Sequence, residues 1–309
     1  CFWGTEAYLK KLPGVIETEV GYANSQFPDP SYEDVCYGDT NAVECVRVSY
    51  DEDVIPLQLL LEGYFRTIDP TSLNKQGNDR GTQYRTGIYW IDPVDEPAVL
   101  SALTKLARKI GKPLRIEYGK LENFYPAENY HQDYLDKNPT GYCHVNIAGA
   151  RHFIAEHETD FNIAQHDYPK PDEPKLKEML DPQTFAVTQE AATERAFSHP
   201  YDHEFAKGIY VDAVTGQPLF SSEDKFDSHC GWPAFSKPIA ESVIAERMDD
   251  SLLGMPRIEV RSASGDTHLG HVFDDGPADL GGQRYCINGS ALRFIPEDEM
   301  ESQGYGYLL

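Results

Sequence analysis

The chain has 309 residues, 40% of them hydrophobic and 12% aromatic, which is typical of a folded protein long enough for two domains. Acidic residues outnumber basic ones by 51 to 27, and the net charge of -24 argues against nucleic acid or anionic lipid as a partner. No apolar run approaches the roughly 20 residues that a transmembrane helix needs, so we expect no membrane span.

In the first half, helical and strand patterns alternate. Thr5 to Leu12 predicts a short helix ended by a Pro-Gly pair, and Val15 to Ala23 has strand composition. Glu44 to Tyr50 alternates as a strand, and it places Glu44 on the same face as apolar residues.

Further along, two longer helical patterns span about Pro56 to Arg66 and Pro93 to Ile110. Between them lie a Gly- and Asn-rich loop at 74–82 and a strand at Thr86 to Ile91. The first domain, residues 1–155, is therefore predicted to be α+β, an α/β sandwich around a mixed sheet.

Residues 156–175 contain DYPKPDEPK and read as a linker, because prolines alternate there with charges. Beyond a helical pattern at Glu173 to Leu180, residues 176–309 carry short strand-like runs: GIYV, PLF, WPAF, RIEVRS, HVF, RYCIN and LRFI. The second domain is therefore predicted to be mainly β, built of antiparallel sheets.

The six cysteines are widely spaced: Cys1, Cys36, Cys45, Cys143, Cys230 and Cys286. None forms a C-x-x-C pair, which argues against a zinc ribbon and a thioredoxin-type dithiol. Buried structural thiols, scattered disulfides and separately placed reactive thiols remain as interpretations. We interpret Cys36 and Cys45 as structural thiols, with Cys36 as a possible additional relay.

The chain opens with Cys rather than Met, so we expect that an upstream segment has been removed. A lipid anchor on Cys1, as in a processed lipoprotein, is an alternative, in which case the chain is a surface-anchored binding module. The compartment is unknown from the sequence; a cytoplasmic location is expected ahead of a periplasmic or cell-surface one.

Cys1 precedes a predicted helix, where backbone N–H groups and the helix dipole favour a thiolate. Phe2 and Trp3 follow it directly and are candidates for the walls of an apolar pocket beside the sulfur, although both are also plausible core residues.

The motif CFWGTEAY resembles the opening of methionine sulfoxide reductase A, without the leading Gly of its signature. The resemblance continues through GYANSQFPDPSYEDVCYG, DPTSLNKQGNDRGTQYRTGIY and FYPAENYHQDYLDKNPTGYC, and so covers the first domain. It implies a catalytic cysteine at Cys1, an acid at Glu44, pocket tyrosines at Tyr32 and Tyr84, a supporting Asp79 and a recycling cysteine at Cys143. One stretch departs from the family's pattern, since residues 41–43 read Asn-Ala-Val before the acid.

The chemistry of a sulfoxide agrees with this resemblance. Its methyl group needs an aromatic cage and its oxygen needs donors, which Phe2, Trp3, Tyr32 and Tyr84 supply. A carboxyl on an apolar strand face should have a raised pKa, so we expect Glu44 to protonate the departing oxygen. Oxygen transfer leaves a sulfenic acid on Cys1, which a second thiol condenses into a disulfide.

In the second half, alternation along RYCIN places Arg284, Cys286 and Asn288 on one strand face, so the thiol has a cationic neighbour that favours thiolate. Cys230 precedes Trp232 in a Gly- and Pro-containing segment that suits a mobile thiol.

His268 and His271 are candidate proton donors to a sulfoxide oxygen. Residues i and i+3 of a straight strand point opposite ways, so both imidazoles serve one site only if the Leu269–Gly270 step bends. A metal pair is the alternative, although no further ligands follow with zinc spacing.

The segments PLFSSEDKFDSHCGWPAF, IEVRS, HLGHVFDDGP and GGQRYCINGSALRFIP resemble methionine sulfoxide reductase B. This implies Cys286 as the catalytic cysteine, Cys230 as the recycling one and Trp232 as the methyl-binding aromatic. His268, His271 and Asn288 become polar partners of the substrate oxygen, and Arg284 tunes the thiolate. Many members of that family bind zinc through two C-x-x-C pairs that this chain lacks, so we expect no metal.

Together the resemblances imply a bifunctional enzyme that reduces the S sulfoxide in its first domain and the R sulfoxide in its second. The substrate would be methionine sulfoxide, free or in oxidised proteins, and each disulfide would require thioredoxin or a related dithiol, with no bound cofactor. Peroxide reduction by low-pKa thiols is the rival enzymatic interpretation, but it leaves the aromatic residues without a purpose.

Overall fold

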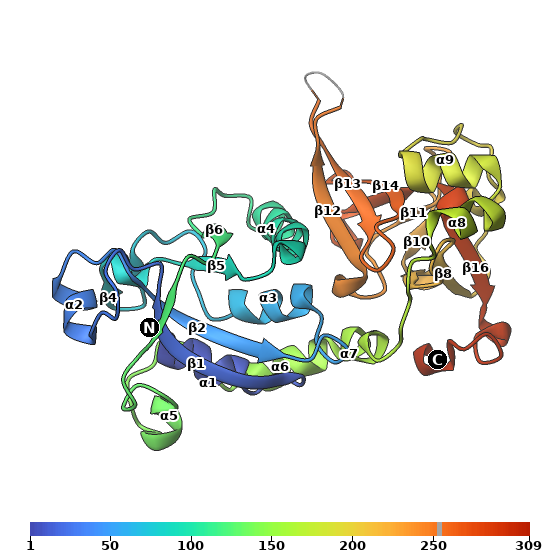
Figure 1. Cartoon of the computed structure of the whole chain (residues 1–309). Helices are drawn as coiled ribbons and strands as arrows, with labels where there is room; N and C mark the ends of the chain where they lie inside the picture. The colour runs from blue at the N-terminus through green and yellow to red at the C-terminus, as the bar shows by residue number, and fades with distance from the viewer. Residues whose placement is uncertain (252–254) are drawn as a thin grey trace. The chain divides into compact units, whose positions relative to one another are not determined.

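The structure is a computed structural model, and it describes residues 1–251 and 255–309. The chain divides into two compact units, Cys1–Glu158 and Thr159–Leu309, and each is described by itself (Figure 1). Helices and strands combine in the first unit, whereas antiparallel strands dominate the second. The predicted fold class, an α+β domain followed by a mainly-β domain, is therefore confirmed.

The first unit is built around strand β1 (Val15–Ala23), which pairs antiparallel with β2 (Val43–Tyr50) and β7 (Phe124–Pro126). Strands β5 (Gly87–Trp90) and β6 (Glu117–Lys120) form a separate parallel pair. A short hairpin consists of β3 (Lys75–Gln76) and β4 (Asp79–Arg80). The helices are α1 (Phe2–Leu9), α2 (Tyr32–Tyr37), α3 (Leu57–Phe65), α4 (Glu96–Ile110), α5 (Tyr134–Lys137) and α6 (Gly149–Glu156).

The beginning of helix α1 differs from the prediction in a way that matters for the site. The helix starts at Phe2 rather than Thr5 and ends at Leu9. Cys1 is consequently its N-cap residue, directly at the end where the backbone N–H groups are unpaired. The predicted strands at 15–23 and 44–50 and the two long helices are confirmed, with ends that differ by a few residues.

The sequence patterns did not predict the helices α2, α6, α7 (Glu158–Ala164) and α9 (Pro182–Glu190). The segment predicted as a linker, 156–175, holds α7 and the start of α8 (Glu173–Met179). Helix α9 has a start signal in its sequence, since the Asp181 side chain accepts from two backbone N–H groups and Pro182 occupies the first turn.

The second unit contains a six-stranded antiparallel sheet in the order β10-β11-β15-β14-β13-β12. Its strands are β10 (Lys225–Phe226), β11 (Ala234–Phe235), β12 (Ile244–Asp249), β13 (Arg257–Ser262), β14 (His268–Phe273) and β15 (Arg284–Ile287). A second sheet has the order β16-β8-β9, with β8 (Gly208–Asp212), β9 (Pro218–Ser221) and β16 (Leu292–Pro296). Each of the seven predicted runs overlaps one of these strands, although WPAF begins before β11 and RYCIN extends past β15. Strands β10 and β12 were not predicted.

The core of the second unit lies between these two sheets. Tyr210 and Leu219 from one sheet cluster with Val260, Val272 and Ile287 from the other. Because successive side chains alternate across a strand, the residues between them point to the other face of the six-stranded sheet, and these residues are mostly polar. That polar face carries the candidate site of the second unit. Within the described residues, no helix has both the length and the apolar character to cross a bilayer.

Candidate active sites

The first candidate site lies where the N-terminus of α1 meets strand β2. The Phe2 N–H donates to Glu44 Oε2 at 3.2 Å, and the Cys1 backbone nitrogen lies 3.6 Å from the same oxygen. The Glu44 side chain is only 5% exposed. Residues distant in sequence are thus brought together, with the carboxyl group beside the backbone of the candidate nucleophile.

Burial governs the protonation of Glu44. Removal from water raises the pKa of its carboxyl above the usual value, while the Phe2 hydrogen bond opposes this and the nearby charge of Asp79 adds to it. A carboxyl group with a raised pKa retains its proton at a higher pH, which is what a general acid requires.

Two tyrosines complete the polar part of this site. Tyr32 begins α2 behind a Ser31 capping box, and burial raises its pKa. Burial also raises the pKa of Tyr84 to about 12, with further contributions from the charges of Glu44 and Asp79. Both phenols therefore keep their protons near neutral pH and are available as donors.

The aromatic part of this site centres on His131, a residue to which the sequence patterns assigned no role. Its ring lies 5.3 Å from that of Phe2 and 4.7 Å from that of Tyr32. The Trp3 indole N–H donates to His131 Nδ1 at 3.2 Å, and the indole stacks on Tyr134 at 3.8 Å. Phe2 is buried and Trp3 half-buried, so the two rings also serve as packing residues.

A cavity of about 300 Å³ adjoins Cys1. Its lining includes Phe2, Glu44 and Tyr84 together with apolar side chains of β2, α3 and β5. A mainly apolar cavity with a few convergent polar groups is the usual form of a small-molecule site. Trp3 and Tyr32 do not line this cavity.

Cys143 lies against helix α1, although it follows α5 in sequence. A methyl group added at Gly4 would be 2.8 Å from its sulfur, and Cys143 Sγ also contacts the Val145 N–H at 3.4 Å. Only a glycine at position 4 leaves room for this approach. The segment after α5 thus carries its thiol to the helix turn that begins at Cys1.

We expect Glu44→Gln to lower the reaction rate at the first site by about a hundredfold to ten-thousandfold, the contribution typical of a general acid. In the unchanged protein, activity should fall as the pH rises through the raised pKa of Glu44, because only the protonated carboxyl donates. The variant should lack this limb of the pH–rate profile. If the variant keeps this pH-dependent fall, Glu44 is not the acid. The reaction at the second site, which does not contain Glu44, is the internal control.

The second candidate site holds two sulfurs in contact. Cys230 Sγ lies 3.6 Å from Cys286 Sγ, well beyond the roughly 2.05 Å of a disulfide bond, and both thiols are free. Cys286 is on β15, where it pairs with Ala234 of β11. Cys230 lies on the turn between β10 and β11, so the pairing of β11 with β15 brings the thiols together.

The contact between the two thiols shifts their pKa values in opposite directions. The hydrogen bond with Cys286 lowers the pKa of Cys230 to about 5, helped by the Ser228 hydroxyl at 2.8 Å. The same bond, with burial, raises the pKa of Cys286. Arg284 opposes this rise, because its charge and its hydrogen bond lower the pKa of Cys286.

Arg284 is held in a fixed orientation on the same strand. Its guanidinium forms two hydrogen bonds to Asp275, each 2.8 Å long, and lies 4.5 Å from the centre of the Phe273 ring. Its charge lowers the pKa of both Cys230 and Cys286, and this is the direction expected of a group that stabilises thiolate.

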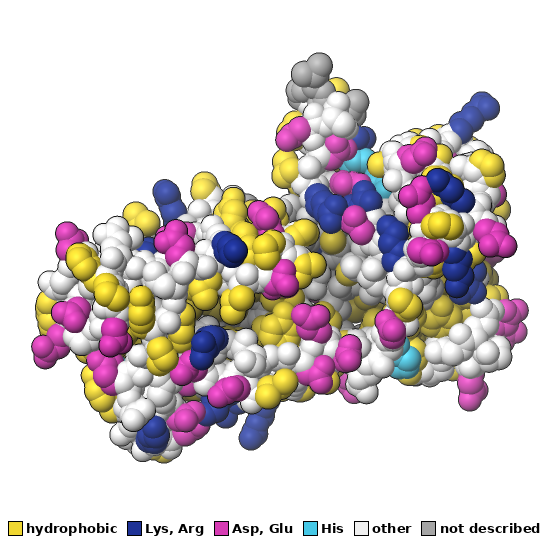
Figure 2. Space-filling view, in the orientation of Figure 1, with side chains coloured by type: hydrophobic (Ala, Val, Ile, Leu, Met, Phe, Trp, Pro, Cys, Tyr) yellow, Lys and Arg dark blue, Asp and Glu magenta, His cyan; other side chains and the backbone are white. Residues whose placement is uncertain are grey.

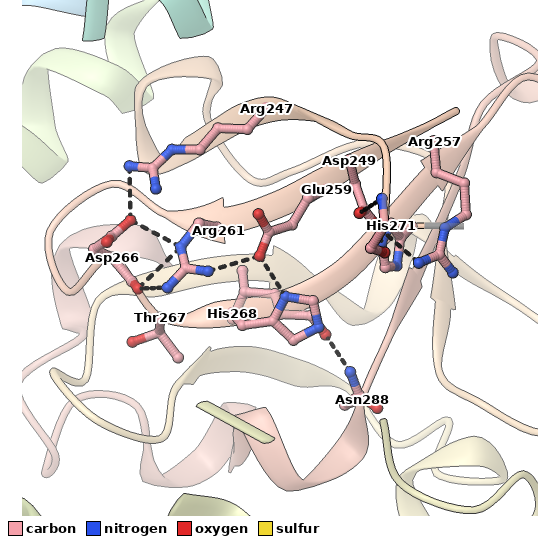
Figure 3. Close-up of polar contacts among 12 residues, drawn as sticks. Arg247, Asp249, Arg257, Glu259, Arg261, Asp266, Thr267, His268, His271 and Asn288 are labelled. Atoms are coloured by element: carbon pink, nitrogen blue, oxygen red, sulfur yellow. Dashed lines mark hydrogen bonds and ion pairs between the residues drawn. The ribbon is translucent and has the colours of Figure 1, made fainter. Parts of the chain in front are cut away.

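His268 and His271 lie on the same side of β14, with ring centres 5.7 Å apart (Figure 3). The register between β13 and β14 shifts at this point, so the step through Leu269 and Gly270 is not that of a straight strand. A side chain at Gly270 would meet the Cys286 carbonyl at 2.1 Å. His271 stands directly opposite Cys286 in the ladder, so their side chains point to the same face of the sheet.

Each imidazole is bound to a carboxylate (Figure 3). His268 Nδ1 lies 2.6 Å from Glu259 Oε1, and His271 Nε2 lies 2.8 Å from Asp249 Oδ2. Burial lowers the pKa of His271, partly offset by Asp249. Among the described residues, His268 Nε2 is buried and has no hydrogen-bond partner.

Basic and acidic side chains lie side by side over β12, β13 and β14 (Figure 2). Arg257 pairs with Asp249 and Arg261 with Glu259, both at 2.6 Å. The His268 hydrogen bond and the charge of Arg261 outweigh burial and lower the pKa of Glu259 to about 2. The hydrogen bonds from Ser251, with smaller contributions from His271 and Arg257, lower the pKa of Asp249. The polar row therefore runs from the sulfur pair across the sheet to its edge strand.

Trp232 and Asn288 meet at a segment of irregular backbone. The Trp232 indole N–H donates to the Glu194 carbonyl at 3.2 Å, and Asn288 Oδ1 accepts from the Glu194 N–H at 3.1 Å. The amide of Asn288 also donates to the Leu269 carbonyl at 3.0 Å. The pairing of the strands and the segment around Glu194 thus bring together the residues predicted for the second site: Cys230, Trp232, His268, His271, Arg284, Cys286 and Asn288.

Sequence reasoning missed the residues that support these side chains: His131 in the first unit, and Glu194, Asp249 and Glu259 in the second. His131 stands in an aromatic-rich motif, NYHQDY, and Glu259 in RIEVRS, where it alternates with buried Val260. These patterns indicate that the two residues face a site, but they do not predict which residues they contact.

Comparison with known proteins assigns each half separately. Residues 1–162 match the family model of peptide methionine sulfoxide reductase, and residues 180–296 match that of the SelR domain. The chain is similar to Mxr1 from Saccharomyces cerevisiae in its reduced form, with 41% identity over 46% of this chain and 83% of that one and a TM-score of 0.44. It is also similar to methionine sulfoxide reductase A of Corynebacterium diphtheriae, with 38% identity over 47% and 74% and a TM-score of 0.43. A complex of Mxr1 with Trx2 aligns at 26% identity over 43% and 77%, with a TM-score of 0.30.

Proposed function

Because the chain belongs to the peptide methionine sulfoxide reductase family and carries a SelR domain after its first domain, it reduces methionine sulfoxide, and we propose that the two domains divide the epimers. The first domain takes the S sulfoxide and the second the R sulfoxide. Substrates are methionine sulfoxide, free or in oxidised proteins, so the chain repairs oxidative damage to methionine.

In the first domain, the Cys1 thiolate attacks the sulfoxide sulfur while Glu44 delivers a proton to its oxygen. The hydroxyl group then passes from the methionine sulfur to the Cys1 sulfur while the bond between the two sulfurs breaks, so methionine leaves and Cys1 becomes a sulfenic acid. The Cys143 thiol then attacks this sulfur, which expels water and forms a disulfide. The position of Cys1 at the start of α1 and the burial of Glu44 support this sequence of steps.

In the second domain, Cys286 is the nucleophile and His268 or His271 supplies the proton. Cys230 condenses with the sulfenic acid on Cys286. The single observation that carries the proposal is the 3.6 Å approach of Cys230 to Cys286, since a disulfide needs only a small movement from that distance. Each disulfide takes two electrons from thioredoxin or a related dithiol, and no bound cofactor enters the cycle.

The recycling cysteines test this proposal. Cys143→Ser should still yield one methionine per enzyme from the S sulfoxide but stop thioredoxin-driven turnover, because the sulfenic acid no longer becomes a disulfide. Cys230→Ser should do the same for the R sulfoxide. Methionine formed in a single turnover and in steady state with thioredoxin, on each resolved epimer, measures both effects.

Each variant contains its own control, since Cys143→Ser should recycle normally on the R sulfoxide and Cys230→Ser on the S sulfoxide. Undiminished cycling with thioredoxin in either variant on its own epimer would contradict the assigned disulfide. Loss of both activities from one change would contradict the division of epimers between domains.

A further inference from the structure

A buried carboxylate next to the second site has no role in the chemistry proposed above. Glu194 belongs to the segment 191–199, which follows α9 and has no helix or strand. Its side chain accepts from the Gly289 N–H at 2.6 Å, the Ser290 N–H at 2.9 Å and the Ser290 hydroxyl at 2.5 Å. Glu194 is 5% exposed, so these bonds stand in for the water that its charge has lost. The carboxylate thus anchors the segment to the two residues that follow Asn288.

The backbone of the same residue contacts both substrate-facing side chains. Its N–H donates to Asn288 Oδ1, and its carbonyl accepts from the Trp232 indole. With the bond from Asn288 Nδ2 to Leu269, the first of these fixes which way the carboxamide faces. The second fixes the rotation of the indole ring.

The anchored segment also reaches the turn that carries Cys230. The Phe197 N–H donates to the Gly231 carbonyl at 2.8 Å, between Cys230 and Trp232. The Phe197 ring packs so closely that a side chain at Gly231 would meet it at 2.8 Å. One segment therefore braces the end of β15 and the thiol-bearing turn.

We propose that Glu194 is a positioning residue of the R sulfoxide site, and that it acts through Trp232 and Asn288 without touching the substrate. The inference rests on the proposed function of the second domain. Its physical basis is that a buried charge with three directional hydrogen bonds holds irregular backbone more rigidly than packing alone.

The test of this inference replaces the Glu194 side chain. Glu194→Ala should raise the KM for the R sulfoxide by about tenfold to a hundredfold, the usual cost of displacing binding groups by about 1 Å, with a smaller fall in kcat. Glu194→Gln keeps one acceptor and should lose less. Glu190→Gln, an exposed carboxylate at the end of α9, is the matched control and should leave both constants unchanged. S sulfoxide turnover on the same molecules reports that the chain is folded.

A double-mutant cycle separates positioning from a purely structural role. If Glu194 acts through Asn288, then Glu194→Ala and Asn288→Ala should be non-additive in kcat/KM, because both remove the same constraint. Additive effects would overturn the inference, and so would a fall in melting temperature with KM and kcat unchanged in Glu194→Ala. If the unchanged protein did not reduce the R sulfoxide at all, the proposed function would fail first, and this inference with it.

Discussion

Cys286→Ser should abolish reduction of the R sulfoxide and leave reduction of the S sulfoxide at its original rate. A serine hydroxyl is a far weaker nucleophile toward sulfur than a thiolate, and Arg284 favours a negative charge on sulfur at this position. We expect a loss of about a thousandfold or more in kcat/KM, as for other enzymes that lose their nucleophile. Methionine formed from each resolved epimer, with dithiothreitol as reductant, measures the effect.

The small-molecule reductant matters because it makes the assay independent of Cys230. Residual R turnover within about tenfold of the original rate would mean that Cys286 is not the nucleophile. Equal loss of both epimers would mean that the sites are not independent. Consumption of hydrogen peroxide without formation of methionine by the unchanged protein would instead favour a peroxidase.

Cys1→Ser should produce the opposite pattern: kcat/KM for the S sulfoxide should fall by about a thousandfold or more, and reduction of the R sulfoxide should be retained. The sulfur of Cys1 stands at the N-terminus of α1, where unpaired N–H groups favour a thiolate, and the neighbouring Glu44 is positioned to supply the proton. Serine at this N-cap position should preserve the helix, since Ser is itself a favoured cap.

Far-ultraviolet circular dichroism and the melting temperature should therefore be unchanged in Cys1→Ser, which separates lost chemistry from lost folding. Chemical trapping offers an independent measurement. After one turnover with the S sulfoxide, a sulfenic-acid reagent should label Cys1 in the Cys143→Ser background. Labelling of Cys36 in place of Cys1 would show that another thiol receives the oxygen.

Local patterns predicted most of the elements that carry these sites. The alternation in residues 44–50 and 257–262 and the apolar run at 15–23 suffice to predict strands, because side-chain direction repeats every two residues whatever lies elsewhere in the chain. The same alternation correctly placed Arg284 and Cys286 on one strand face. Helix α9 was missed because its apolar pattern is weak, although its Asp-Pro start is a recognisable signal.

Local patterns were less informative about partners. The sequence offers no sign that Glu44 contacts the backbone at Cys1 and Phe2, or that Glu259 binds His268 diagonally across the ladder rather than its direct neighbour His271. From the sequence, both imidazoles could face one side only if the strand bends at Gly270. The register shift that provides this bend is seen only in the structure. Strand register depends on which distant residues pack beneath the sheet, and this information is spread over the whole unit.

The sequence by itself determined the candidate reacting groups of this protein: two sets of thiols, aromatic rings and proton donors, one in each half of the chain. The tertiary structure alone decided which groups touch, including the 3.6 Å contact of Cys230 with Cys286 and the anchoring of Asn288 and Trp232 by Glu194. The reason is physical, since side-chain chemistry and strand or helix periodicity are properties of neighbouring residues, whereas distances between residues far apart in sequence follow from the packing of the complete fold.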